Sequence, residues 1–217
     1  MIRAVISDFG GVLTTPLAGS FTAFAERSGI SLAALGTAMA TVAARDGVNP
    51  LHELERGRVT EASFTEAIGA TLSEQIGRDV GMVSFAADYF DGLEPNAPMI
   101  ELMASLRDSG LRMALLTNNV HEWECHWRAM APIEELFELV VDSSQVGMRK
   151  PEPAIYQLTT DRLGVDPREC LFIDDFEHNC DAARDAGMTT VVYRDAEQAI
   201  AEVHAALRAH DDAAARS

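Results

Sequence analysis

The chain has 217 residues, enough to bury a hydrophobic core without disulfides or a structural metal, and with 47% hydrophobic and 24% charged residues its composition is ordinary for a globular protein. Its formal net charge of −17 argues against nucleic acid and anionic membranes as partners, because both would repel it. The three cysteines form no CxxC pair, so we expect no zinc site. No apolar stretch approaches the ~20 residues of a membrane helix, so we expect no membrane span. No signal-peptide pattern is present, and we expect a cytoplasmic protein.

Five short runs rich in valine, isoleucine or leucine predict strands that are buried on both faces of a parallel sheet. Segments of helical composition separate the last four runs, and helices between parallel strands imply right-handed crossovers. We therefore expect a three-layer α/β core with a Rossmann-like sheet. In chain order the predicted strands span residues 4–7, 113–117, 139–142, 171–174 and 190–193.

The segment between the first two predicted strands is too long for a single crossover. It has helical composition, and Thr60 is a candidate N-cap for one of its helices. We expect an inserted helical subdomain at residues 16–94, a core formed by residues 1–15 and 95–210, and a disordered tail at residues 211–217.

Polar side chains follow the predicted strands at their carboxyl ends, where open parallel sheets bind their ligands. In chain order they are Asp8, Thr117, Asn118, Lys150, Asp174 and Asp175. Each of them alone has an ordinary structural explanation, as a turn residue, a helix cap or a solvated charge. Together, however, they supply a carboxylate, a hydroxyl, an amide, a cation and an acidic pair, which are the groups that phosphoryl transfer to an aspartate requires.

The acidic residues of this set would hold Mg²⁺, a hard cation that prefers oxygen ligands. Lys150 and the metal would then neutralise the charge on the phosphoryl oxygens. Lys150 is also the only lysine of the chain, against sixteen arginines. A compact ammonium suits such a position better than a broad guanidinium, although a chance surface lysine also explains the count.

Four segments of the chain resemble, in the same order, the four sequence motifs of the haloacid dehalogenase-like (HAD) hydrolase superfamily. They are DFGGVL, LLTNN, GMRKPEPAIY and FIDDFEHNCDAARDAGM. The inserted segment is similar in length to the helical C1 cap of that superfamily. Among its subgroups, the motifs are most similar to those of phosphatases that resemble the N-terminal domain of soluble epoxide hydrolase.

The resemblance implies a role for each of the polar residues. Asp8 would be the nucleophile that forms an aspartyl-phosphate intermediate. Lys150 would bridge the phosphate and Asp8, while Thr117 and Asn118 would hold phosphoryl oxygens. The metal site would consist of Asp8, Asp175 as a direct ligand, the main-chain carbonyl of Gly10, and Asp174 through water or a hydrogen bond.

One position departs from the usual pattern of the superfamily. Most of its phosphatases carry a second aspartate two residues after the nucleophile, which acts as general acid and base, and here that position is Gly10. A positioned proton donor typically contributes about 10² to 10⁴-fold to a rate. The enzyme would therefore need substrates with good leaving groups, such as acyl, aryl or glycosyl phosphates, or a proton donor from the cap or from His121.

Two other interpretations stay open. The dehalogenases of the superfamily also lack an acid at this position, need no metal and attack carbon, but the resemblance implies that they do not keep the acidic pair, which is present here. The chain could also be a catalytically impaired binding protein. We rank a phosphatase of a small phosphorylated metabolite first, a metal-independent 2-haloacid dehalogenase second and the impaired protein third.

Polar residues near a turn of the cap are the candidates for substrate recognition. They are His52, Glu55, Arg56 and Arg58, and His121 is added because it follows the second motif closely. A cap that closes over the site needs such groups to recognise the substrate and exclude water, although a solvated surface turn accounts for them as well. Neither the leaving group nor the oligomeric state follows from the sequence.

Overall fold

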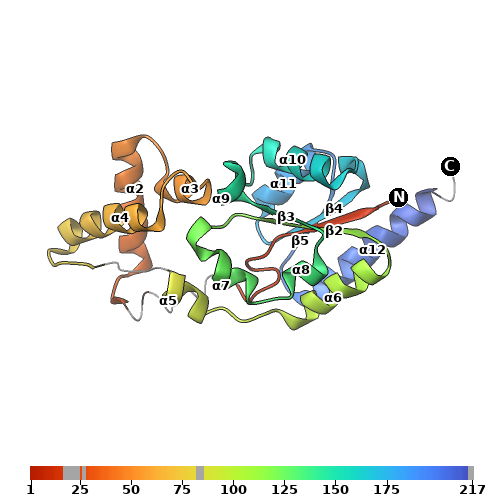
Figure 1. The fold of residues 1–217 in the computed structure, drawn as a ribbon, viewed down its shortest axis with the longest axis horizontal. Helices are drawn as coiled ribbons and strands as arrows, with labels where there is room; N and C mark the ends of the chain where they lie inside the picture. Colours follow the sequence, from red (N-terminus) through yellow and green to blue (C-terminus); the bar gives the residue numbers. More distant parts are fainter. Residues whose placement is uncertain (17–24, 26–27, 82–85, 215–217) are drawn as a thin grey trace.

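The computed structural model describes residues 1–16, 25, 28–81 and 86–214 (Figure 1). These segments contain a five-stranded parallel sheet in the order β3-β2-β1-β4-β5. All five predicted strands are confirmed, each within one residue of its expected bounds. The strands are β1 (Ala4–Ser7), β2 (Arg112–Thr117), β3 (Leu139–Asp142), β4 (Cys170–Asp174) and β5 (Thr189–Val192).

Helices cover both faces of the sheet and give the expected three layers (Figure 1). On one face lie α6 (Ala97–Asp108) and α12 (Ala196–Ala214), and on the other lie α10 (Pro153–Leu163) and α11 (Glu177–Asp185). Successive side chains of a strand point to opposite faces, so Val5 joins the hydrophobic cluster under α6 and α12. Ala4 and Ile6 join the cluster under α10 and α11.

Short helical segments lie in the connections between the strands. They are η1 (His121–Trp123), α7 (Glu124–Arg128), α8 (Ile133–Leu136), α9 (Ser143–Val146) and η2 (Pro167–Glu169).

The inserted segment, which we call the cap, forms helices on the left of Figure 1. They are α2 (Leu32–Asp46), α3 (Pro50–Glu55), α4 (Glu61–Ile76) and α5 (Ala86–Asp91). Buried apolar residues of α2, such as Leu35 and Val42, and of α4, such as Ile68 and Leu72, belong to one hydrophobic cluster. Thr60 Oγ1 accepts a hydrogen bond from the main-chain nitrogen of Ser63 at 3.2 Å, which confirms the predicted N-cap of α4.

Main-chain hydrogen bonds join the two segments that connect the cap to the core. The nitrogen of Thr15 donates to the oxygen of Glu94 at 2.8 Å, and the nitrogen of Asn96 donates to the oxygen of Leu13 at 2.9 Å. The chain therefore leaves the core and returns to it at one place, so the insertion does not interrupt the sheet.

The last helix is longer than the sequence predicted. α12 continues to Ala214, so the first four residues of the expected disordered tail at residues 211–217 are helical, and 215–217 lie outside the described residues. The physical reason is the run of alanines that follows the two aspartates, because alanine has the highest helix propensity. None of the helices in the described segments is both long and apolar enough to cross a membrane.

Candidate active site

Asp8 lies immediately after β1 and is almost fully buried. Its main-chain nitrogen donates to the oxygen of Ile173 at 2.8 Å, which ties it to the neighbouring strand β4. Its Oδ1 accepts hydrogen bonds from the nitrogen of Phe9 and from Nζ of Lys150, both at 2.7 Å. No hydrogen bond within the described part of the chain reaches Oδ2, so this oxygen is the one available for chemistry.

Lys150 is a buried lysine with two carboxylate partners, rather than a solvated surface charge. Its Nζ lies 2.7 Å from Oδ1 of Asp8 and 2.7 Å from Oδ2 of Asp174, and the residue is only 1% exposed. The side chain of Asn118 accepts a hydrogen bond from the nitrogen of Lys150 at 2.8 Å and donates one to its oxygen at 3.0 Å. Both polar atoms of the Asn118 amide thus hold the main chain of the lysine in place, a contact that the sequence analysis missed.

The two residues of the acidic pair have different surroundings. Asp174 is fully engaged, because Oδ2 contacts Lys150 while Oδ1 accepts from the nitrogen of Phe176 and from Nδ2 of Asn179, both at 2.9 Å. Oδ1 of Asp175 is buried and has no hydrogen-bond partner. Asp174 therefore positions its neighbours, whereas Asp175 keeps an oxygen that needs a ligand.

The second glycine of DFGGVL makes room for Asp175. Gly11 has a φ of +79°, and a Cβ added there would lie 2.4 Å from Oδ2 of Asp175. Both the left-handed backbone and the close approach of a carboxylate require glycine at this position. The two glycines after Asp8 were visible in the sequence. The reason for Gly11 was not, because Asp175 follows the fourth strand, far away in the chain.

Negative charge exceeds positive charge at this end of the sheet. Asp8, Asp174 and Asp175 each place an oxygen within 4.8 Å of the others. Burial raises the pKa of Asp8 to about 8, with Asp174 and Asp175 adding to the rise and Lys150 opposing it. Burial and the charge of Asp174 likewise raise the pKa of Asp175 to about 6.

These residues fit a divalent cation with hard-acid character. The donors are carboxylate oxygens, which Mg²⁺ prefers, and the buried Oδ1 of Asp175 lacks any other partner. Three acidic groups face a single ammonium, so a cation would also relieve their mutual repulsion.

A cavity of about 440 Å³ separates this charged cluster from the cap. Its floor includes Asp8, Gly10, Thr117 and Asn118. The rest of the lining is mainly apolar or aromatic. It includes Leu35, Met39, Leu54, Phe64, Tyr89, Phe90, Leu93, Val120, Trp123 and Phe176, with His52, Glu55, Arg149 and His178 as the charged or titratable groups.

Of the cap candidates from the sequence, His52 and Glu55 line this cavity. Arg56, Arg58 and His121 are absent from its lining within the described residues. Arg56 instead pairs with Glu53 and Glu152, Arg58 pairs with Glu53, and His121 is exposed in η1. Arg149 lines the cavity and was not identified from the sequence, because it stood beside the more conspicuous Lys150.

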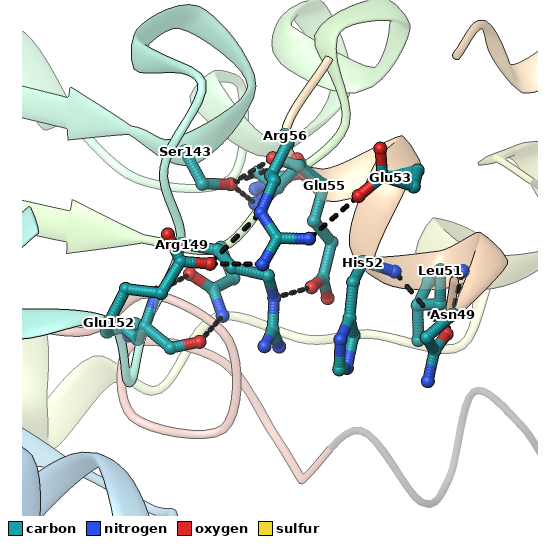
Figure 2. A network of polar contacts seen from close by, with 12 residues as sticks. Asn49, Leu51, His52, Glu53, Glu55, Arg56, Ser143, Arg149 and Glu152 are labelled. Carbon is teal, nitrogen blue, oxygen red and sulfur yellow. Dashed lines mark hydrogen bonds and ion pairs between the residues drawn. The ribbon is translucent and has the colours of Figure 1, made fainter. Parts of the chain in front are cut away.

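A network of polar contacts joins α3 to the core segment that carries Lys150 (Figure 2). Oγ of Ser143 donates to the main-chain oxygen of Glu55 at 2.6 Å, and Nε of Arg149 donates to Oε2 of Glu55. Nε of Arg56 donates to Oε1 of Glu152 at 3.0 Å. We call these three contacts the latch.

Gly57 brings the main chain of the cap directly against the core beside the latch. Its φ is +65°, and an added Cβ would lie 2.3 Å from the main-chain oxygen of Ser144. The turn after α3 therefore packs on the segment that leads to Lys150 at a distance that only glycine allows.

Comparisons with known proteins agree with this geometry. The sequence profile of the haloacid dehalogenase-like hydrolases matches residues 2–187. The chain is 31% identical over 170 residues to bifunctional epoxide hydrolase 2 of Rattus norvegicus, covering 71% of this chain and 30% of that protein. It is 26% identical over 196 residues to the sesquiterpene phosphatase astK of Aspergillus oryzae, covering 86% and 87% of the two chains.

A solved structure shows the same fold. The HAD family enzyme BT-2542 of Bacteroides thetaiotaomicron, in complex with magnesium and inorganic phosphate, matches with a TM-score of 0.67 at 26% identity, covering 89% of this chain and 95% of that chain. The chain therefore belongs to the haloacid dehalogenase-like hydrolases. It spans less than a third of the length of the rat relative.

Proposed function

We propose that the chain is a Mg²⁺-dependent phosphatase that hydrolyses small phosphomonoesters through an aspartyl-phosphate intermediate on Asp8. One observation carries the proposal. Oδ1 of Asp8 is fixed by Lys150, its Oδ2 takes no hydrogen bond in the described structure, and the residue lines the cavity beside the partnerless Oδ1 of Asp175. The phosphatase name of the fungal relative and the magnesium and phosphate bound to the bacterial neighbour support it.

Each residue of the floor has a part in this proposal. Oδ2 of Asp8 attacks phosphorus, while Lys150 neutralises a phosphoryl oxygen and opposes the rise in the pKa of the attacking carboxyl group. Thr117 offers its hydroxyl to a second phosphoryl oxygen, and Asn118 fixes Lys150 through its main chain. Asp8, Asp175 and the carbonyl of Gly10 would hold Mg²⁺, which when bound supplies positive charge to the phosphoryl group.

The cavity also indicates the kind of alcohol that the phosphate esterifies. Its volume of about 440 Å³ falls within the range of small-molecule sites, and its walls away from the floor are mainly apolar and aromatic. An apolar leaving group would bury its surface there and gain about 25 cal/mol per Å². The fungal relative is named for a sesquiterpene substrate, which is consistent with an ester of an apolar alcohol.

The dehalogenase interpretation finds less support in the site. Its strongest argument is the lack of a carboxyl side chain at Gly10. A reaction at carbon has no phosphoryl charge to neutralise, yet the site keeps both Asp174 and Asp175 beside the nucleophile. A bound cation would give the buried Oδ1 of Asp175 the partner that it lacks.

Phosphate release from a panel of phosphomonoesters, with and without Mg²⁺, tests the proposal. We expect release that needs Mg²⁺ and is lost in Asp8→Asn, whereas the matched control Asp161→Asn, at an exposed helix position, keeps it. Trapping the phosphorylated protein with labelled substrate would show the intermediate. Halide release from 2-haloacids without metal, and no phosphate release, would instead establish the dehalogenase.

A further inference from the structure

Gly10 leaves the reaction without its usual source of a proton, since its side chain has nothing to donate. For an ester of an ordinary alcohol, another group in the cavity must then protonate the leaving oxygen, because an alkoxide is a poor leaving group. Of the described residues that line the cavity, the titratable candidates away from Asp8 are His52, Glu55, Tyr89 and His178. His121, the donor considered from the sequence, is exposed and does not belong to this lining.

Glu55 has one fixed and one available oxygen. It is the last residue of α3, and its side chain is 16% exposed. The main-chain oxygen is held by Ser143, and Oε2 is held by Nε of Arg149. Within the described residues no hydrogen bond reaches Oε1. Figure 2 shows the carboxyl group extending away from the Arg56–Glu53 pair, toward the same side as the imidazole of His52 and the guanidinium of Arg149.

The charges around Glu55 place it close to the reacting groups. Burial raises its pKa, and the positive charges of Arg149, Lys150 and Arg56 oppose this rise. Lys150 is the residue whose Nζ contacts Asp8, so the carboxyl group lies within electrostatic reach of the nucleophile's partner. Tyr89 lines the same cavity as Asp8 and Glu55, and burial raises its pKa, with the charges of the two acids adding to the rise.

The other titratable groups suit the task less well. Burial and the charges of Arg149 and Arg56 lower the pKa of His52, so its imidazole is neutral and has no excess proton to give. Burial raises the pKa of Tyr89, which makes the phenol a weaker acid and a poorer proton donor. His178 is exposed to solvent. A buried carboxyl group with an elevated pKa can both give and accept a proton near neutral pH.

We propose that Glu55 is the general acid and base that replaces the missing aspartate at Gly10, an assignment that rests on the proposed phosphatase function. In the first step Oδ2 of Asp8 bonds to phosphorus, the bond from phosphorus to the leaving oxygen breaks, and that oxygen takes the proton of Glu55. In the second step the Glu55 carboxylate takes a proton from water as the water oxygen bonds to phosphorus. The bond from phosphorus to Asp8 then breaks, which releases phosphate and regenerates the Asp8 carboxylate and the protonated Glu55.

The dependence on the leaving group tests this assignment in the variant Glu55→Gln, which keeps the size of the side chain and an acceptor for Arg149. Single-turnover alcohol release is measured with benzyl phosphate and with 4-nitrophenyl phosphate. We expect a loss of about 10² to 10⁴-fold with the benzyl ester and below about 10-fold with the nitrophenyl ester, whose oxygen leaves without a proton. Equal losses with both esters would overturn the assignment.

Matched variants separate proton transfer from a change in shape. Glu53→Gln lies on the same helix, pairs with Arg56 and Arg58 outside the cavity lining, and is expected to lower both rates equally or not at all. His52→Gln and Tyr89→Phe are likewise expected to leave the ratio of the two rates unchanged. A changed ratio in either of these two variants, with none in Glu55→Gln, would move the role to that residue.

A second measurement applies even where loss of the Glu55–Arg149 contact destabilises the Gln variant. Arg149→Gln removes the positive charge that most strongly lowers the pKa of Glu55. Because the protonated acid is the active form, the fall of kcat/KM at high pH should move to higher pH in this variant. If kcat/KM falls at the same pH in this variant as in the wild type, Glu55 does not have the proposed role. If the wild type releases phosphate from no ester, the proposed function itself fails, which is a different result.

Discussion

The floor and the roof of the cavity are built in opposite ways. The floor, at the carboxyl ends of β1, β2 and β4, holds the Lys150 ammonium in contact with Asp8 and Asp174, and Asp175 places an oxygen within 4.8 Å of both carboxylates. The roof, formed by α2 to α5, is mainly apolar, and Glu55 is its one carboxyl group among the described lining residues. Buried charges need fixed partners, which a sheet provides, whereas apolar surface tolerates exchange of side chains. In the proposed function, the reaction would therefore depend on the sheet, and the choice of substrate would depend on helices whose side chains can vary.

The largest expected effect comes from breaking the charge balance of the floor. Lys150→Met leaves Asp8 and Asp174 without their shared cation, and removal of one partner of a buried ion pair costs about 3 to 5 kcal/mol. Chemical denaturation would measure this loss of unfolding free energy. The control Arg162→Met, at an exposed position of α10, should change it by less than about 0.5 kcal/mol. A similar result for both variants would show that the floor does not depend on the lysine.

The next effect concerns the place where the first motif meets Asp175. Gly11→Ala would push a Cβ into Oδ2 of that carboxylate, so Mg²⁺ affinity should fall about 10 to 100-fold, as it does when the support of a metal ligand is disturbed. Isothermal titration calorimetry with Mg²⁺ measures this change. Gly77→Ala is the control, because Gly77 has a similar φ of +73° and open space around the added Cβ. Equal Mg²⁺ affinity in the two variants would contradict the assignment of Asp175 as a ligand.

The joint between floor and roof is tested at Gly57. Gly57→Ala combines a strained left-handed backbone with a clash against the main-chain oxygen of Ser144, whereas Gly47→Ala has the strain alone, at a φ of +74° with nothing nearby. The strain costs each variant about 1 to 2 kcal/mol. We expect Gly57→Ala to lose more stability than the control and to show faster hydrogen exchange at the end of α3. Equal losses would mean that the cap can shift away from the core without cost.

The residues of the floor could be predicted from the sequence, whereas most residues of the roof could not, and the difference has a physical reason. Buried strands of a parallel sheet end at one edge, so the polar residues after each run, such as Asp8 and Asp174, had to meet there. In the cap, "HELERGR" contains one apolar residue, Leu54, and so has no apolar period to show which side faces the core. Glu55 and Arg56 are neighbours, yet one lines the cavity and the other pairs with Glu152. The need for glycine at Gly11 and Gly57 arises from distant chain segments that a local pattern cannot reveal.

The smallest expected effect lies in the roof itself. Met39→Gln keeps the length of a cavity-lining side chain but replaces its thioether with an amide, which binds an apolar leaving group less well. We expect KM for phosphates of apolar alcohols to rise about 10-fold, which corresponds to about 1.4 kcal/mol. Inhibition by inorganic phosphate should stay unchanged, because in the proposed function phosphate would contact only the floor. Leu32→Gln, exposed on the same helix, is the control. A parallel loss of phosphate inhibition in Met39→Gln would mean that floor and roof are not independent, since a change confined to the roof would then have moved the charged groups beneath it.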